Sequence, residues 1–504
     1  MKLFFILTIL AFSYQLCAQK QLQDSSAIPY SLIAIEESPK LKTALKKLHE
    51  LYENQKKNNF TGGDSIFTII HIGDSHIQGD HFSGEIRKQL QGYFGNGGQG
   101  ILFPYGLAKS FGPRGTSLKS LGKWKGVKTL TPNLSDKLGL TGYGAFTSDS
   151  NASISVSFNE KFENTFFQKI NIWHTSDQES YITQLNNSFK LLERKDYSSG
   201  WGVSSYKSDT LLNSFTLTSK SNNNNQKHYG FYGFEIVPSI SHGLIYHHCG
   251  VVGAQFTHLI NNAPLTIEQI AHLSPDIIIF SFGTNEAYND GIDTASYNAA
   301  VQKFIKELEK ASPKTAIIIT TAPDTRSQNR IPSQQISINN QLKQIVKTCS
   351  ISLFDLNKAM GGWGSLYSWH KNQLTLSDKL HFTASGYSIQ GQLFSLSLLN
   401  AYNKINFTDT INISLLRNTV IETMTKVLDI NKKDSINNDS PLGNQQAPLK
   451  NNNSKNKVHI IKKGETIHRL SNMYHVSKKS ILRANHINQK TILKIGQKII
   501  IPKK

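Results

Sequence analysis

The sequence predicts an α/β fold in which a parallel sheet carries helices on both faces and is interrupted by an all-β segment. Three observations predict it. Short β-branched runs alternate with amphipathic stretches in two separate parts of the chain, the pattern of strand–helix–strand units. Between those parts, residues 111–240 hold short alternating runs bounded by Gly, Asn and Ser clusters. A compact, basic unit closes the chain at 457–503.

Length and composition set the first bounds. The chain has 504 residues, a net charge of +20, 38% hydrophobic residues and three cysteines. At roughly 150 residues per domain this is room for about three domains. The composition excludes collagen-like chains, coiled coils and disulfide-rich miniproteins. Beyond the N-terminus, no stretch approaches the ~20 apolar residues of a membrane span.

Residues 1–18 have the pattern of a signal peptide. Lys2 precedes a short apolar run, 3–12, and the small residue Ala18 ends the segment. A signal anchor is the alternative, disfavoured because the apolar run is short. We therefore expect an exported protein of the periplasm or cell surface, with no integral membrane span after cleavage. Export permits a disulfide, but we expect Cys249 and Cys349 to be free or buried thiols.

The elements follow in order. Residues 19–62 have helical spacing and form an N-terminal helical segment. A strand at 66–72, a helix around 85–94 and a glycine-rich loop at 95–100 come next. After the β segment, the pattern resumes with these strands and helices: strands 244–248, 276–282, 316–320 and 351–356, helices 294–310 and 384–401. We expect 63–110 and 241–402 to form one discontinuous domain with 111–240 inserted, and 403–456 to be a helical tail and flexible linker.

Four short polar segments stand at the carboxyl ends of strands or in nearby loops, where open α/β sheets place their sites. They are 73–76, 250–253, 283–286 and 378–381. A serine in a strand-to-helix turn, Ser75, can present its hydroxyl beside a helix N-terminus. Asp378 stands three residues before His381, so its carboxylate can bind Nδ1–H and leave Nε2 to act as base toward a serine.

These four segments, in this order, resemble the SGNH (GDSL-type) hydrolase family. The resemblance implies a flavodoxin-like, three-layer α/β/α sandwich and a serine esterase that needs no cofactor and no metal. Ser75 would be the nucleophile, His381 the general base and Asp378 its orienting partner. The oxyanion hole would be formed by the N–H groups of Ser75 and Gly253 and the amide of Asn285.

Two alternatives stay open around this site, a different oxyanion glycine and a metal site, and two residues depart from the family's motifs. Gly250 competes with Gly253 for the oxyanion role. His76 replaces the leucine usual in the first motif, and Glu286 stands where the third motif often has Asp. Several histidines could suggest a metal, although their spacing fits no ligand set well: His71, His76, His81, His247 and His248.

Further features narrow the resemblance. The glycine-rich motif 361–365, Trp369 and the β insertion together look like the peptidoglycan O-acetylesterases, in which a carbohydrate-binding-module-like β-sandwich interrupts the hydrolase. Aromatic residues of the insert either form its core or stack on sugar rings: Trp124, Tyr143, Trp173 and Trp201.

The C-terminal unit, 457–503, resembles the LysM domain, with a βααβ order. LysM domains bind N-acetylglucosamine-containing glycans, which points to peptidoglycan as partner. The matching groove would be lined by Gly464, Glu465, Thr466, Ile467, Asn485 and Ile495. Residues 457–504 carry 12 Lys or Arg against one acid, a solvated face or an attraction to an anionic polymer; export argues against nucleic acid.

Together these features predict an exported esterase that removes O-acetyl groups from peptidoglycan, on muramic acid, through an acetyl-enzyme on Ser75. LysM would hold it at the glycan. The alternatives are an acetylesterase or acetyltransferase acting on another polysaccharide, and a non-catalytic cell-wall-binding protein with the same fold.

Overall fold

The chain forms two compact units, Met1–Asn437 and Asn438–Lys504. The computed structural model describes residues 34–57, 66–113, 115–159, 161, 165–237, 242–326, 332–405, 410–435, 457–461, 466–474, 476–485, 487 and 497–502. The predicted signal peptide lies outside these residues. Within them, no helix combines the length and apolar character that crossing a membrane requires.

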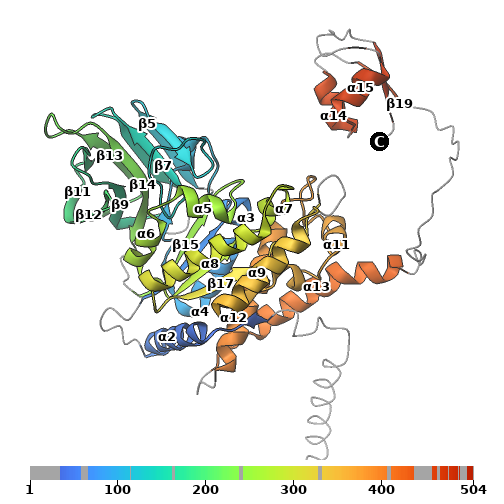
Figure 1. Cartoon of the computed structure of the whole chain (residues 1–504), viewed down its shortest axis with the longest axis horizontal. Coiled ribbons are helices and arrows are strands. Elements are labelled where there is room, and N and C mark those ends of the chain that lie inside the picture. Colours follow the sequence, from blue (N-terminus) through green and yellow to red (C-terminus); the bar gives the residue numbers. More distant parts are fainter. Residues whose placement is uncertain are drawn as a thin grey trace, which may run out of the picture. The chain divides into compact units, whose positions relative to one another are not determined.

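The first unit is built on one sheet, two of whose strands, β15 and β17, are labelled in Figure 1. Its strand order is β1-β18-β17-β16-β2-β15-β3. Its strands from β18 to β3 pair in parallel, and β1 is antiparallel to β18. β16 is buried along its whole length, as parallel strands covered on both faces are. The strands are β1 (Ile35–Glu36), β2 (Ile66–Gly73), β3 (Asn96–Gly98), β15 (Gly243–Gly250), β16 (Ile277–Ser281), β17 (Ala316–Thr320) and β18 (Ser352–Phe354).

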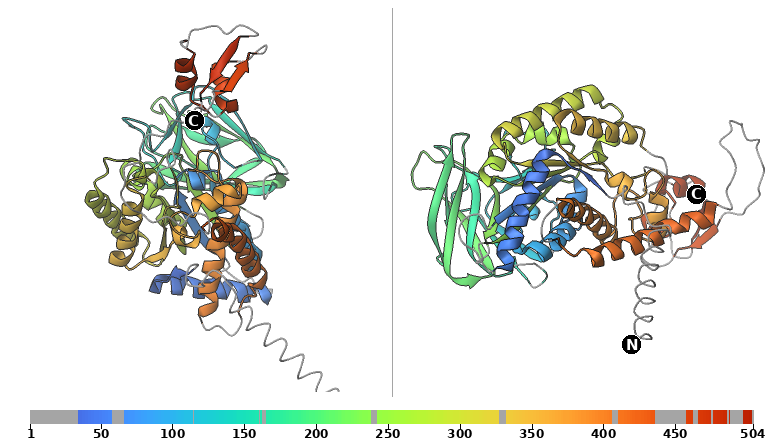
Figure 2. Two further views of the ribbon diagram at one scale, coloured as in Figure 1. Left: turned by 90° about the vertical axis from the view of Figure 1, so that its right-hand side faces the viewer. Right: turned by 90° about the horizontal axis from the view of Figure 1, so that it is seen from below.

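Two layers of helices cover the sheet, on opposite sides of it in Figure 2. Side chains alternate along β2: Phe67 and Ile69 join one apolar cluster, and Ile70 and Ile72 join the other. The first cluster includes α2 (Pro39–Lys56), α4 (Phe82–Phe94), α12 (Ala384–Lys404) and α13 (Ser414–Ser435). The second includes α5 (Phe256–Asn262), α6 (Thr266–Leu273), α8 (Thr294–Ala311) and α9 (Gln335–Cys349). The predicted three-layer α/β/α fold is confirmed.

Residues 116–237, which we call the β segment, form strands in two further sheets, ordered β10-β13-β8-β5 and β11-β12-β9-β14-β7-β6. Trp173 and Phe231 of this segment belong to the same apolar cluster as Ile70 and Phe280 of the α/β sheet. The segment therefore packs as part of the first unit; its independence as a domain stays a prediction. The strands are β5 (Thr116–Leu121), β6 (Lys125–Lys128), β7 (Tyr143–Thr147), β8 (Ser153–Phe158), β9 (Phe167–Thr175), β10 (Ile182–Leu185), β11 (Phe189–Tyr197), β12 (Trp201–Leu212), β13 (Ser214–Lys220) and β14 (Tyr229–Val237).

The structure corrects the sequence prediction at both edges of the α/β sheet. The predicted glycine-rich loop contains β3, which pairs with β15, and β4 (Ile101–Leu102) follows it and pairs with β14. A Cβ at Gly97 would lie 2.9 Å from the backbone of Leu244, so only glycine allows this approach. The N-terminal segment likewise supplies an edge strand, β1, before its helix.

The second unit has the predicted βααβ order: β19 (Lys457–Ile460), α14 (Ile467–Tyr474), α15 (Lys478–Ala484) and β20 (Lys498–Ile501). β19 and β20 pair antiparallel. A small core of its own holds the unit together, formed by Ile461, Leu470, Val476, Ile481, Ile499 and Ile501.

Candidate active site

The candidate nucleophile sits where β2 turns into the short helix α3 (Ser75–Gln78). Asp74 caps this helix, and its Oδ1 accepts from the His76 N–H at 2.9 Å. A Cβ at Gly73 would lie 2.6 Å from the Ser281 carbonyl oxygen, so glycine lets β2 end tightly against β16. The turn thus fixes Ser75 at the carboxyl edge of the sheet.

Three side chains predicted from two separate motifs lie in one hydrogen-bonded row. Ser75 Oγ is 2.9 Å from His381 Nε2, and His381 Nδ1 is 2.8 Å from Asp378 Oδ2. Because Nδ1 donates to the carboxylate, Nε2 is left to accept the serine proton. The row has the geometry of a nucleophile, a general base and an orienting acid.

Asp378 is held as a carboxylate. Burial opposes its ionised form, but hydrogen bonds from the His381 side chain and from the backbone N–H groups of His381 and Leu380 outweigh burial and lower its pKa. An ionised Asp378 keeps Nδ1 of the imidazole protonated and stabilises the imidazolium formed during reaction.

Two residues that the sequence analysis missed support this loop. The Arg326 N–H donates to the Lys379 carbonyl at 3.0 Å, and Arg326 also pairs with buried Asp324. Asp324 Oδ2 accepts from the N–H groups of Gly364 and Leu366 at 2.9 and 3.1 Å. The glycine-rich motif at 361–365 is therefore tied to the Asp–His loop. No spacing signal in the sequence links these partners.

Two of the predicted oxyanion donors are available. The Val252 N–H donates to Gln78 Oε1 at 2.7 Å, and the His76 N–H to Asp74. In contrast, the N–H groups of Ser75 and Gly253 have no hydrogen-bond partner among the described residues. Gly253 has a φ of 80°, a left-handed conformation that favours glycine. Gly250, the competing candidate, ends β15, where a Cβ would lie 2.1 Å from the Gln78 nitrogen.

Asn285, the third predicted donor, lies between the first two motifs. Its Nδ2 donates to the Ala254 carbonyl at 2.9 Å and, over a longer 3.4 Å, to Asp74 Oδ2. Donation to an oxyanion would replace that longer bond. The neighbouring Glu286 is fully buried and accepts from the backbone N–H groups of Phe256 and Gly283. Burial raises the pKa of Glu286 to about 7.

His76, which stands where the resembling family has leucine, is a buried, uncharged imidazole that lies beside His381. Its Nδ1 pairs with the Tyr387 hydroxyl at 2.9 Å, and its ring centre is 5.5 Å from that of His381. Burial, and then the charge of His381, lower its pKa to about 3. Among the described residues, no three His, Cys, Asp or Glu side chains are grouped to hold a metal ion.

The structure describes some, but not all, of the other candidate residues. Trp173 and Trp201 are fully buried and Tyr143 is too, which confirms the core interpretation for these three aromatic residues. Of the six LysM positions, Thr466, Ile467 and Asn485 are described, and Gly464, Glu465 and Ile495 lie outside the described residues. Cys249 and Cys349 are both free.

The Asn485 side chain joins α15 to β20 by hydrogen bonds. Its Nδ2 donates to the carbonyls of Ile481 and Ile500, and its Oδ1 accepts from the Ile500 N–H. These bonds clamp α15 to β20. A glycan-binding role for Asn485 stays a prediction.

Comparison with known families agrees with this geometry. Residues 237–389 match the GDSL-like lipase/acylhydrolase family and residues 459–502 match the LysM domain. The chain carries a GDSL-like acylhydrolase domain and a LysM domain. This makes it a carboxylic ester hydrolase by class. The matched range contains Gly253, Asn285, Asp378 and His381, and the fold brings Ser75 to them from outside it.

A solved structure shows the same fold. One described as a peptidoglycan O-acetylesterase is 22% identical and covers 72% of this chain and 96% of its own, with a TM-score of 0.59. A lipase/acylhydrolase from Enterococcus faecalis is 21% identical over 31% of this chain and 76% of its own, at a TM-score of 0.25. At 22% identity, the likeness to the first of these structures establishes the fold alone. The curated proteins contain no match to the chain.

Proposed function

We propose that this protein is an exported serine esterase that removes O-acetyl groups from peptidoglycan, on its muramic acid residues. The observation that carries the proposal is the hydrogen-bonded row Ser75, His381 and Asp378, with the unpaired N–H groups of Ser75 and Gly253 available to an oxyanion. The LysM domain supports a glycan polymer as the substrate. The likeness to a structure described as a peptidoglycan O-acetylesterase agrees with it.

The reaction follows from these positions. His381 Nε2 takes the Ser75 hydroxyl proton as Oγ attacks the acetyl carbonyl carbon. The carbonyl oxygen becomes an oxyanion, which the N–H groups of Ser75 and Gly253, and the Asn285 amide, stabilise. Collapse breaks the ester bond, and His381 returns the proton to the departing sugar oxygen. Water, deprotonated by His381, then hydrolyses the acetyl-enzyme and releases acetate.

The LysM domain supplies retention at the polymer. A tethered glycan-binding unit raises the effective concentration of the esterase near its substrate without any new contact in the active site. It would bind N-acetylglucosamine-containing glycan, and the hydrolase unit would act on acetylated sugars within reach.

Acetate release tests the proposal. The full chain should release acetate from O-acetylated sacculi and none from the same sacculi after base-catalysed deacetylation. Ser75→Ala and His381→Ala should lower the turnover of sacculi and of a chromogenic acetyl ester by about 10⁴-fold or more, with folding unchanged. A Ser75→Ala variant that keeps most of its activity would contradict the mechanism.

A further inference from the structure

Gln78 lies at the end of the helix that Ser75 begins, and it is completely buried. Its amide group makes four hydrogen bonds, two at Oε1 and two at Nε2. Oε1 accepts from the Val252 N–H at 2.7 Å and from the Tyr143 hydroxyl at 2.7 Å. Nε2 donates to Ser110 Oγ at 2.9 Å and to the Phe111 carbonyl at 2.5 Å. We propose that Gln78, supported by Tyr143, is the positioning residue that sets the Gly253 oxyanion donor against Ser75.

The loop from Val251 to Ala254 depends on a small number of backbone anchors. The Val251 N–H donates to the Gly73 carbonyl and the Ala254 N–H to the Val251 carbonyl, both at 3.0 Å. The Val252 N–H is held by Gln78. The next N–H along the loop, that of Gly253, has no partner among the described residues. The bond between Gln78 and the Val252 N–H therefore fixes the peptide group that directly precedes this donor.

Because Gln78 and Ser75 share one short helix, Gln78 acts as a strut between the two proposed oxyanion donors. An oxyanion hole works only when its donors point at one place 2.7–3.1 Å away. Loss of the strut would let the Gly253 N–H shift, and misplacement by about 1 Å can cost a hundredfold in rate.

The strut is anchored in the β segment. Tyr143, on β7, is fully buried and packs against Phe103 and Tyr105 at ring-centre distances of 5.4 and 5.0 Å. Its hydroxyl also lies 3.2 Å from Ser110 Oγ, the second partner of Gln78. A buried aromatic side chain of the β segment therefore donates to the same Gln78 oxygen that holds the Val252 N–H.

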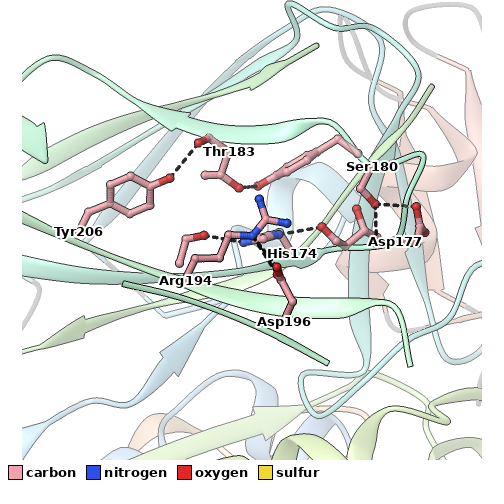
Figure 3. A network of polar contacts seen from close by, with 10 residues as sticks. His174, Asp177, Ser180, Thr183, Arg194, Asp196 and Tyr206 are labelled. Atoms are coloured by element: carbon pink, nitrogen blue, oxygen red, sulfur yellow. Dashed lines mark hydrogen bonds and ion pairs between the residues drawn. The ribbon is translucent and has the colours of Figure 1, made fainter. Parts of the chain in front are cut away.

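The β segment offers a matched control. Tyr206, on β12, is also buried, and its hydroxyl donates to the Thr183 carbonyl at 2.8 Å within the network of Figure 3. Neither Tyr206 nor Thr183 contacts Gln78 through a hydrogen bond of the described residues. Tyr143→Phe and Tyr206→Phe thus each remove one buried hydroxyl from the same segment, and only the first weakens the strut.

The test is a kinetic comparison in the full chain with a soluble chromogenic acetyl ester. Tyr143→Phe should lower kcat about tenfold with KM within twofold, because the donor acts mainly in the transition state. Gln78→Met should lower kcat about a hundredfold. Tyr206→Phe should leave kcat within twofold, even where its melting temperature falls as much as that of Tyr143→Phe.

A double-mutant cycle sharpens the test, because the Tyr143 hydroxyl is proposed to act through Gln78. Adding Tyr143→Phe to Gln78→Met should lower kcat no further. Equal kcat effects of the two Tyr→Phe changes, or additive effects in the cycle, would overturn the inference. If Gln78→Met does not fold, the comparison of Tyr143→Phe with Tyr206→Phe decides alone.

This inference rests on the proposed function, and the two can fail separately. An active Ser75→Ala variant would overturn the proposed function. An inactive Ser75→Ala variant together with a fully active Tyr143→Phe variant would overturn only the role of Gln78 and Tyr143.

Discussion

Two regions of the chain accompany the α/β sheet, and they differ in whether they share its core. The β segment, 116–237, shares its apolar core with one face of the sheet and sends Tyr143 to Gln78 behind the catalytic turn. The LysM unit has its own small core and its own clamp at Asn485. The first region is thus built into the catalytic unit, and the second can act through binding alone.

The largest expected effect comes from removing each region in turn. Deletion of 116–237 would expose the buried side chains of the shared core, each worth about 1.5–3 kcal/mol, against a total stability of about 5–15 kcal/mol. We expect that variant to give no folded, active enzyme. Truncation after Asn437 should leave kcat for a soluble acetyl ester within about twofold and sharply reduce pull-down with sacculi.

Circular dichroism and ester assays on both variants check this contrast. A folded, active protein without the β segment would show that the segment is an independent module. Unchanged pull-down after truncation would move the binding role from the LysM unit to the first unit.

The next prediction tests whether Asn285 donates to the oxyanion itself or only positions the loop beside it. Asn285→Ala should lower kcat about 10²–10³-fold, the range for one side-chain donor of an oxyanion hole. It also removes the bond to the Ala254 carbonyl, so its melting temperature is measured beside kcat. A loss below tenfold in a fully folded variant would remove Asn285 from the hole and leave the donors of Ser75 and Gly253.

The sequence predicted those strands and site residues that have a pattern within a few neighbouring positions, and it missed those defined by distant partners. The long apolar strands β2, β16 and β17 and the three triad residues were found because each has a pattern or motif of its own. β1 and β3 are only two and three residues long, and pairing with a neighbour defines them. Gln78 was missed for the same reason, since its partners lie 32 to 174 positions away.

The burial of the Asp74 carboxyl in the catalytic unit should make the unfolding free energy depend on pH. Burial, opposed by the hydrogen bond from His76, raises the pKa of Asp74 to about 8. Between pH 4 and pH 8 the folded state therefore holds a proton that the unfolded state has lost, so Asp74 makes the protein less stable as pH rises through this window. Asp74→Asn, which is neutral throughout, should escape part of this loss.

Denaturant unfolding at pH 5.5 and pH 7.5 measures the effect. The difference in unfolding free energy between wild type and Asp74→Asn should move by roughly 1–2 kcal/mol in favour of the variant at the higher pH. Asp293→Asn is the control: Asp293 is exposed and its pKa is lowered by hydrogen bonds from Ser296 and Ala295, so it is ionised at both pH values. Parallel curves for wild type and Asp74→Asn would show that Asp74 is ionised in the folded protein.

The smallest expected effect concerns what the LysM unit recognises. Residues 457–504 carry a local charge of +11, and attraction to an anionic wall would be screened by salt, since the Debye length falls from about 10 Å at 0.1 M to about 3 Å at 1 M. Groove binding of a neutral N-acetylglucosamine chain depends on hydrogen bonds and ring contacts that salt barely weakens. We expect the 457–504 fragment to keep binding sacculi at 1 M salt with a modest loss of affinity.

Competition decides between the two sources of that binding. Soluble chitin oligomers should displace the fragment if a groove holds the glycan, because they offer the same neutral sugar without the wall's charge. The basic residues would then speed the encounter, and the groove would select the polymer. Complete release at 1 M salt, with no displacement by chitin oligomers, would leave only charge attraction, and the LysM unit would then keep the enzyme near any anionic surface rather than at peptidoglycan.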